Sequence, residues 1–394
     1  MSAAYTGNVS TQGGVLQLAF ELGWTQWQLA FTIGYGQKPR QRTIRARDLA
    51  ALEQEIAKAK KRFQLAGAAP VVSCYEAGRD GFWLHRYLTA RGVTNVIVDS
   101  ASIEVNRRKR RVKSDKLDAN KLVTMLLRYH AGEKKVWSVV RAPSVADEDQ
   151  RQLHRELQEL KDDRTRHTNR IKGLLASQGL AFEAVDELLP TWLGTARLWD
   201  GTTLGADLQR RLIREYERWQ FVQRQILELT RERRRRMLCD TTPHVDMVRR
   251  LLGLAGIGVN GAWLLVYEFF AWRKLQNRKQ AGALVGLTGT PYQSGTSEHE
   301  QGISKAGSKR MRKMLVELAW CWLRWQGQTA LSQWYARRFG TGKGAARKIG
   351  VVAVARKLFI ALWKYLERGE VPAGAKLVDW RSKLIRPKVK EPAA

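Results

Sequence analysis

Cysteine is scarce in this chain, and none of its positions forms a pair. The 394 residues include only Cys74, Cys239 and Cys321, which lie far apart in the sequence. Zinc sites and disulfide frameworks need paired or closely spaced cysteines, so the sequence argues against both. Unpaired cysteines are also typical of a reducing compartment, and we therefore expect a cytoplasmic protein. The six histidines show no metal-ligand spacing either.

Long apolar runs are absent as well. The longest one covers residues 261–272, contains Glu268 and is too short to span a bilayer. The N-terminus lacks the basic and then apolar pattern of a secretory signal. Both absences predict a protein that does not contact a membrane.

Acidic residues are few relative to basic ones. Lysine and arginine number 69 against 37 aspartates and glutamates, which gives a formal net charge of +32. This surplus is spread along the chain and would repel itself without a polyanionic partner, so it predicts nucleic-acid binding. Fifteen tryptophans add rings that can stack on bases, although some must belong to the core. With 44% hydrophobic residues, the chain is long enough for two or three domains.

Residues 14–135 alternate between short apolar runs and helical patterns, after a loose tail at residues 1–13. The apolar runs predict five strands, at residues 15–20, 27–33, 43–46, 71–75 and 96–98. Helical periodicity predicts one helix after the third strand, one after the fourth and one after the fifth; Asp48 caps the first of them. This order of elements predicts an α/β domain with a mixed sheet.

Four carboxylates lie at the ends of these predicted elements. Glu21 closes the first strand and Glu76 closes the fourth, and the last helix opens with Asp115 and Asp118. Active groups of open α/β sheets gather at strand ends, where neighbouring loops converge. Four acids placed in this way could hold one or two divalent cations for phosphoryl transfer, although each acid taken alone is typical of a surface.

The two aspartates lie three residues apart, just after Ser114, which can cap the helix. Like charges at this spacing repel unless a cation lies between them or between them and other carboxylates. A solvated helix start, with acids that favour the helix dipole, explains the spacing equally well. A basic run directly upstream is typical of polyanion binding; it comprises Arg107, Arg108, Lys109, Arg110, Arg111 and Lys113.

Residues 145–240 are charged and helical, with narrow apolar stripes that recur every three or four residues. Such stripes predict a coiled-coil hairpin or an oligomerisation arm, and an ordinary helical subdomain fits them as well. A basic run ends this arm, and we expect it to meet phosphates; it comprises Arg233, Arg234, Arg235 and Arg236.

Residues 245–370 form the predicted C-terminal domain, which is mainly helical and precedes a basic tail at residues 371–394. An apolar helix, the turn Gly256-Ile257-Gly258 and a second helix resemble a helix-hairpin-helix element. The glycines of such an element let backbone N–H groups approach a DNA phosphate. A simple tight turn between packed helices fits the same residues.

A loop rich in glycine, threonine and proline follows at residues 286–295 and contains Ser294. A serine in such a loop is usually a turn residue, so its position alone gives little reason to assign a nucleophilic role. We expect the loop to face the start of a helix at residues 308–325, whose first turns carry Lys309, Arg310, Arg312 and Lys313.

The order of these motifs is specific. It runs through Glu76-Ala77-Gly78, Ser114-Asp115-Lys116-Leu117-Asp118-Ala119, Gly256-Ile257-Gly258, Gly286-Leu287-Thr288, Pro291, Ser294-Gly295 and Gly307-Ser308-Lys309-Arg310-Met311-Arg312. The ordered set resembles the DEDD transposases of the insertion-sequence one-ten family over residues 14–335. The resemblance implies that residues 14–135 are like the domain of the RuvC Holliday-junction resolvase, a ribonuclease-H fold. It also implies a coiled-coil middle and a C-terminal transposase domain with an essential serine.

Carried over residue by residue, the resemblance assigns Glu76, Asp115 and Asp118 as the second, third and fourth acids of a site for Mg²⁺ or Mn²⁺. Ser294 matches the essential serine. The family usually has aspartate where this chain has Glu21, whose longer side chain shifts the oxygens against the tight octahedral geometry of Mg²⁺. Asp99, just after the fifth predicted strand, is an alternative ligand.

The resemblance further implies a recombinase that acts on donor and target DNA and is directed by a structured non-coding guide RNA. Its cell would be bacterial or archaeal, with the protein at the nucleoid. The acids would act through a metal that polarises a DNA phosphate, and Ser294 would attack phosphorus to form a transient phosphoserine link. Holding two duplexes favours a homodimer or a tetramer. Two alternatives stay open, a metal-dependent Holliday-junction nuclease without serine chemistry and a non-enzymatic scaffold that binds RNA or DNA.

Overall fold

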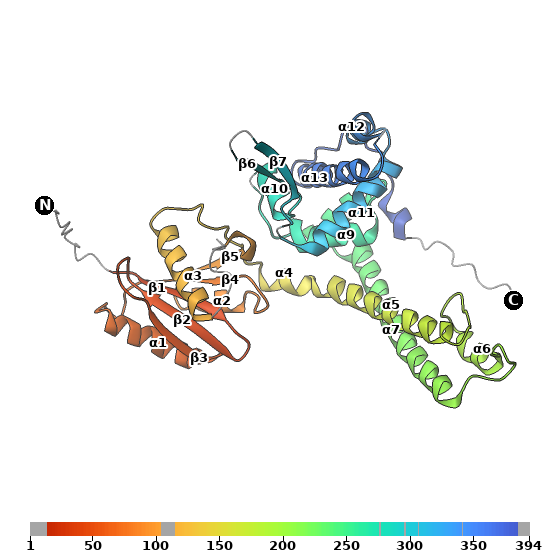
Figure 1. Cartoon of the computed structure of the whole chain (residues 1–394). Coiled ribbons are helices and arrows are strands. Elements are labelled where there is room, and N and C mark those ends of the chain that lie inside the picture. The colour runs from red at the N-terminus through yellow and green to blue at the C-terminus, as the bar shows by residue number, and fades with distance from the viewer. Residues whose placement is uncertain are drawn as a thin grey trace. The chain divides into compact units, whose positions relative to one another are not determined.

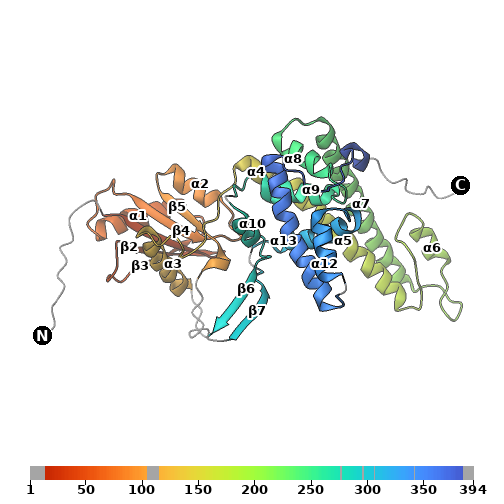
Figure 2. The same cartoon turned by 90° about the horizontal axis from the view of Figure 1, so that it is seen from above.

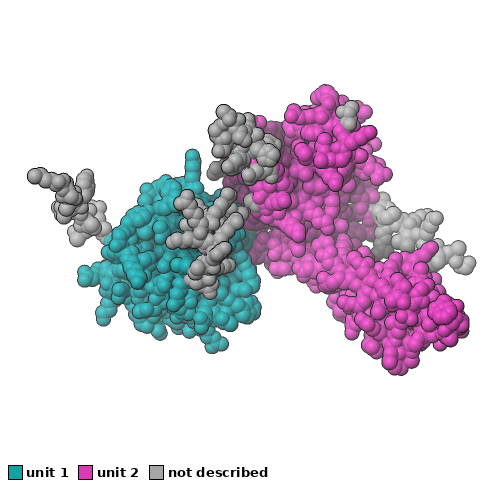
Figure 3. All heavy atoms as spheres, viewed as in Figure 1, with its two compact units in different colours: residues 1–143 teal, residues 144–394 magenta. Residues whose placement is uncertain are grey.

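The computed structural model describes residues 14–103, 115–275, 277–294, 297–305, 307–340 and 342–384. The chain divides into two compact units, unit 1 with residues 1–143 and unit 2 with residues 144–394 (Figure 3). Each unit has hydrophobic core clusters of its own, so each is described by itself. No helix in the described part of the chain is long and apolar enough to cross a membrane.

Unit 1 is built on a five-stranded mixed sheet with the order β3-β2-β1-β4-β5 among the described residues (Figure 1). An antiparallel meander is formed by β1 (Leu16–Leu22), β2 (Gln26–Thr32) and β3 (Arg40–Arg45). Parallel strands extend it from β1, first β4 (Val71–Glu76) and then β5 (Thr94–Val98). The mixed α/β fold predicted from the sequence is confirmed.

Helices cover both faces of this sheet. On one face lie α1 (Leu49–Arg62) and α2 (Trp83–Ala90), which share a core cluster with the inward residues of β1 and β2. The predicted cap of α1 is confirmed, because the Ala51 amide donates a hydrogen bond of 2.9 Å to the Asp48 side chain. On the other face lies α3 (Asp115–His130), the helix that opens with the two predicted aspartates.

Unit 2 begins with a helical hairpin, here called the arm. After α4 (Val145–Gln150), α5 (Gln152–Ala176) runs outward and α7 (Ala206–Cys239) returns beside it, with α6 (Leu189–Thr195) at the far end (Figures 1 and 2). The narrow apolar stripes of the sequence face each other within this hairpin, as in the cluster of Leu157, Val222 and Ile226. The helices predicted for the arm are confirmed.

A buried carboxylate fixes how α5 and α7 pair. Glu215 of α7 is 4% exposed, hydrogen-bonds with His167 Nδ1 at 2.8 Å and accepts bonds from Arg170 at 3.0 Å and Arg218 at 2.7 Å. Burial alone would raise the pKa of Glu215, but the bonds with His167 and Arg170 outweigh it and lower the pKa. The carboxylate therefore stays charged inside the arm.

The rest of unit 2 is a helical core around buried aromatic residues such as Trp263, Trp322 and Phe359. A π-helical turn at Val266–Phe270 continues the second helix of this core. The α-helices are α8 (Pro243–Leu252), α9 (Val259–Leu265), α10 (Arg278–Leu284), α11 (Lys309–Trp325), α12 (Ala330–Phe339) and α13 (Ala345–Arg368).

The segment around Ser294 differs from the prediction. Residues 286–295 were expected to be a loop, but β6 (Gly289–Ser294) and β7 (Ser297–Ile303) form an antiparallel hairpin (Figure 1). The loop prediction was wrong because these residues are polar and lack the alternation of apolar side chains that marks a half-buried strand. Backbone pairing and a bond of 3.0 Å from Thr290 Oγ1 to the Gly302 carbonyl hold the hairpin instead.

The predicted start of the basic tail is also too early. Residues 371–384 fold back on the core, where Gln326 Nε2 donates to the carbonyls of Ala255 and Lys376, both at 3.0 Å. The Lys376 amide donates back to Gln326 Oε1 at 2.7 Å. A short 3-10 helix, Trp380–Leu384, then buries Leu384 in the core.

Candidate functional site

The carboxyl ends of β1, β4 and β5 meet at one edge of the sheet. The parallel register of β1 and β4 ends one residue before Glu21 and Glu76, which therefore occupy neighbouring positions. Glu76 pairs in turn with Val98 of β5, and Asp99 follows directly. The structure thus brings two of the predicted acids and the alternative ligand Asp99 to the same edge.

Strand alternation places Glu21 and Glu76 on the sheet face that α3 covers. Ala19 and Cys74, each two residues earlier in its strand, belong to the core cluster formed with α3. Side chains two residues apart in a strand lie on the same face. The backbone of α3 comes close enough for the Cys74 thiol to lie 3.8 Å from the Leu122 carbonyl oxygen. The helix that opens with the two predicted aspartates therefore shares a face with both glutamates.

The first turn of α3 is held over the sheet by a bond of 3.1 Å from Gln41 Nε2 to the Lys116 carbonyl. Asp118 on this turn is half-buried, whereas the side chain of Asp115 lies outside what the structure describes. Among the described side chains, no group of three histidine, cysteine, aspartate or glutamate residues could hold a metal ion. The donor set of the four acids nevertheless fits a hard cation, because carboxylate oxygens are the ligands that Mg²⁺ and Mn²⁺ prefer. Ser114 and the basic run at residues 107–113 lie outside the described residues.

An aromatic and basic cluster at the same sheet edge was not found from the sequence. Trp24, just after β1, is 64% exposed, and the guanidinium carbons of Arg47 and Arg79 each lie 4.8 Å from its ring centroid. The Asp80 carboxylate forms an ion pair of 3.3 Å with each of the two guanidinium groups. The three residues come from separate loops, so only the sheet order brings them together. The cluster places two arginines beside the acids at this edge of the sheet.

Ser294 is the last residue of β6 in unit 2, and its register partner on β7 is Ser297. The side chain of Ser294 lies outside what the structure describes. Its backbone is nevertheless held in a paired strand rather than in the expected loop. The four acids belong to unit 1 and the serine to unit 2.

The glycines of the helix-hairpin-helix-like turn have different surroundings. Gly256 has φ +82°, and an added Cβ would lie 3.1 Å from the Cys321 carbonyl oxygen and 3.3 Å from Trp325 Cβ on α11. Close packing on α11 therefore accounts for Gly256. Gly258 is exposed and precedes α9, so it is the glycine of the pair that a phosphate could approach.

The arginine run at the end of the arm is divided between core and surface. Arg233 is 5% exposed, and burial lowers its pKa to about 10. Arg235 and Arg236 both pair with Glu232 at 2.8 Å, and Arg234 is exposed. The buried position of Arg233 does not fit the expected contact with phosphates. Arg233 lies on the stripe of buried residues that repeats along α7 at intervals of three or four residues. The sequence already contains this periodicity.

The start of α11 carries the last predicted basic group. Ser308 caps the helix by accepting a bond of 3.3 Å from the Met311 amide. Lys309 and Lys313 are exposed, while Arg312 donates to the Gly307 carbonyl at 3.0 Å. Two of the four predicted cations thus point to solvent from the first turns of the helix.

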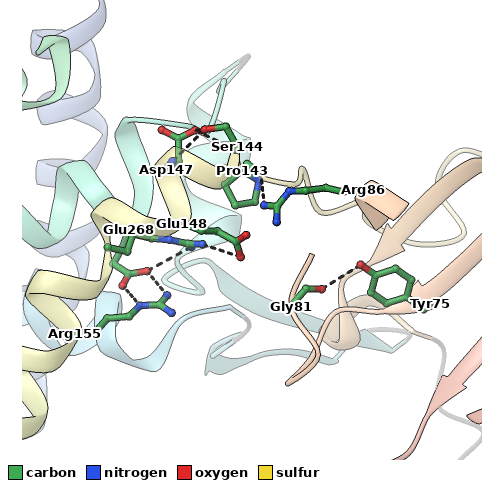
Figure 4. A network of polar contacts seen from close by, with 10 residues as sticks. Tyr75, Gly81, Arg86, Pro143, Ser144, Asp147, Glu148, Arg155 and Glu268 are labelled. Carbon is green, nitrogen blue, oxygen red and sulfur yellow. Dashed lines mark hydrogen bonds and ion pairs between the residues drawn. The ribbon is translucent and has the colours of Figure 1, made fainter. Parts of the chain in front are cut away.

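The remaining predicted cation joins a partly buried ion cluster between the arm and the core. Glu268 accepts two bonds from Arg155, at 2.6 Å and 2.8 Å (Figure 4). Arg310 lies 3.7 Å from the Glu268 carboxylate. Burial alone would raise the pKa of Glu268, but the bonds from Arg155 outweigh it and lower the pKa. The cluster joins α5 to the π-helical turn and to the first turn of α11.

His154 on α5 lies close to this cluster. It is 2% exposed, and neither ring nitrogen has a hydrogen-bond partner among the described residues. Burial first, and then the charge of Arg233, lower the pKa of His154 to about 3. The charge of Glu268 acts in the opposite direction, and those of Arg310 and Lys161 add to the lowering. His154 is therefore neutral at any pH in which a cell operates.

We predict that this histidine makes unit 2 sensitive to acid. A histidine in an unfolded chain has a pKa of about 6.5, so below that pH the unfolded chain binds a proton that the folded chain excludes until about pH 3. Stability is therefore fully present above pH 6.5 and falls as the pH drops, by roughly 3 kcal/mol between pH 7 and pH 4. Urea denaturation at both pH values measures this loss.

The variant His154→Phe keeps a buried ring but cannot take up the proton, so it should lose less stability between the two pH values. The matched control is His130→Phe, because His130 is exposed rather than buried. It should lose as much stability as the unaltered chain. An unchanged loss in His154→Phe would contradict the prediction.

Comparison with known proteins gives a consistent result. Residues 248–335 match the family described as "Transposase IS116/IS110/IS902 family". The putative transposase y4rJ of Sinorhizobium fredii (strain NBRC 101917 / NGR234) is 38% identical over 374 residues, which cover 92% of this chain and 94% of that protein. The transposase for insertion sequence element IS1328 of Yersinia enterocolitica is 29% identical over 170 residues, 42% of this chain and 48% of its own.

A second Sinorhizobium fredii protein, the putative transposase y4qE, is 24% identical over 326 residues, which cover 74% of each chain. The similarity to y4rJ includes parts of both units, because neither unit alone makes up 92% of the chain. On this evidence, the chain belongs to the IS116/IS110/IS902 family of transposases.

Proposed function

We propose that this transposase cuts and rejoins DNA by phosphoryl transfer, with carboxylates of unit 1 as metal ligands and Ser294 as the nucleophile. The observation that carries the proposal is the neighbouring placement of Glu21 and Glu76 at the carboxyl edge of β1 and β4, on the face covered by α3. The acids come from two strands and one helix that lie far apart in the sequence, and the helix shares the sheet face of both glutamates. A surface role for each acid does not account for this convergence.

The sheet supports the finer proposal that unit 1 is a RuvC-like, ribonuclease-H-type domain. An antiparallel meander of β1, β2 and β3 is extended in parallel by β4 and β5. The helix with the last two acids lies against the same three central strands, β2, β1 and β4. This arrangement matches the position of the acids that the resemblance implies.

The residues that would hold Mg²⁺ or Mn²⁺ are Glu21, Glu76, Asp115 and Asp118. Such an ion would polarise the DNA phosphate and stabilise the oxygen that departs. The Ser294 Oγ would form a bond to phosphorus as the bond to one strand breaks, and the released strand end would take up a proton. A free hydroxyl of another strand would then attack the phosphoserine and regenerate the serine. The number of phosphoester bonds is conserved, so no external energy source is needed.

Nucleic acid would be held by the basic groups that the structure leaves at the surface. These are Arg234, Lys309 and Lys313. The basic run at residues 107–113, which lies outside the described residues, would add to them. The net charge of +32 exceeds what one short DNA contact needs, and it supports the further proposal of a structured guide RNA. We also propose a homodimer or tetramer, because strand exchange has to hold two duplexes at once.

The experiment that tests this function traps the phosphoserine link. The full chain is incubated with labelled donor and target DNA and candidate guide RNA, in Mg²⁺ or with a chelator, and denatured before electrophoresis. We expect a labelled protein–DNA adduct in Mg²⁺ that disappears with the chelator. Cleavage without any adduct would favour the junction nuclease, and binding without cleavage would favour the scaffold.

A further inference from the structure

A groove of about 800 Å³ lies at the base of the β6–β7 hairpin in unit 2. Its walls come from α10, α12 and α13, which are neighbours in the fold (Figure 2). Strand exchange as proposed above gives this groove no role. Its floor is apolar and half-buried, and includes Trp334, Phe339, Val352 and Ile360.

Positive charge surrounds this floor. No carboxylate belongs to the lining, whereas six cations do: Arg278, Lys279, Arg338, Lys348, Arg356 and Lys357. Within the part of the chain that the structure describes, none of the six forms an ion pair. Cations that no acid neutralises create a field that attracts a polyanion.

Two contacts hold cations close to the aromatic floor. Lys357 Nζ lies 4.5 Å from the ring centroid of Trp334. Arg356 lies against α10, where a Cβ added to Gly282 would be 3.0 Å from its Nε. The groove therefore offers an aromatic surface and a cation within a few ångströms of each other. A ligand with a flat ring and a phosphate on one backbone matches both.

We propose that this groove binds single-stranded DNA, namely the strand that adjoins the phosphate attacked by Ser294. A duplex keeps its bases stacked inside, so an apolar aromatic floor suits unpaired bases whose phosphates lie along the cationic rim. Gly289 lines the groove and is the first residue of β6, and Ser294 is the last. Five residue steps of about 3.3 Å separate the two, a distance of roughly 17 Å. A single strand of a few nucleotides can therefore reach from the groove to Ser294. The identity of the strand rests on the proposed function.

The test uses the full chain and a fluorescent eight-nucleotide single-stranded DNA that carries one bromodeoxyuridine. Anisotropy measures affinity, and ultraviolet crosslinking followed by peptide mapping locates the base. Lys348→Ala/Lys357→Ala removes two rim cations, and we expect it to weaken binding by about ten- to a hundredfold. The matched control, Lys364→Ala/Arg368→Ala, removes two cations from the same helix outside the groove and should bind as the unaltered chain does. Crosslinks should map to the peptide with Trp334 or to α13.

Equal affinity of the two double variants, or crosslinks that map outside the groove, would overturn the proposal. So would an RNA of the same sequence that binds the groove more tightly than the DNA. The same measurements on Ser294→Ala, which keeps the groove and lacks the proposed nucleophile, separate this inference from the proposed function. If the unaltered chain binds DNA in the groove but forms no adduct, the serine mechanism alone is refuted. An adduct that forms normally in Lys348→Ala/Lys357→Ala, with unchanged DNA affinity, would refute the groove alone.

Discussion

Asp118→Asn should lower strand exchange by at least about 10³-fold while leaving the fold of unit 1 intact. The change keeps the shape of the side chain and removes one charged ligand from the proposed site, in which four carboxylates would surround a divalent cation. The fold should keep its stability, because Asp118 is half-buried and the helix is anchored elsewhere, by Ala119 and Leu122. A strand-exchange assay at saturating Mg²⁺ measures the effect.

The matched control is Glu133→Gln, which neutralises an acid just beyond the opposite end of α3. Glu133 pairs with Arg128 at the surface, so its loss should change exchange by less than about twofold. Two further variants decide which acid completes the site. If Glu21 is the ligand that completes the site, Glu21→Gln should match the loss in Asp118→Asn while Asp99→Asn keeps activity. The reverse result would assign that ligand role to Asp99. Full activity in Asp118→Asn would remove the metal site from the proposal.

The fold of unit 1 could be predicted because its signals are local. The apolar runs of the sequence place each strand except β3 within two residues of its observed ends. β3 begins earlier than expected because it carries charged residues and is held by pairing with β2. Arg40 at its start is buried by an ion pair of 2.6 Å with Glu55, a partner on α1 that no sequence pattern reveals. Elements that depend on a distant partner are therefore the ones that sequence reasoning misses.

The site shows the same division. The neighbouring positions of Glu21 and Glu76 could be predicted because strand ends of an α/β sheet converge. The cluster of Trp24, Arg47 and Arg79 could not, because its residues lie in three loops and no local pattern links them. The groove beside the β6–β7 hairpin was missed for a related reason. Its hairpin has no apolar stripe, and its six cations look in the sequence like an ordinary solvated surface.

Ser294→Ala should abolish strand exchange and adduct formation, with a loss on the order of 10⁴-fold or more, because it removes the hydroxyl that we propose forms the covalent link. The fold should not change, since the paired backbone of β6 holds this position and alanine can adopt the same strand conformation. The adduct assay and the exchange assay, run on the same preparations, measure the two effects together.

The hairpin itself provides the control, because Ser297 is the register partner of Ser294 on the neighbouring strand. Ser297→Ala removes the same hydroxyl from the same hairpin and should keep both the adduct and exchange. Equal losses in the two variants would mean that the hairpin needs polar side chains for its structure and not a nucleophile at one position. Cleavage that survives in Ser294→Ala, but is lost in Asp118→Asn, would show that the metal site cuts DNA with water. Only a loss confined to Ser294 joins the acids of unit 1 and the hairpin of unit 2 in one reaction.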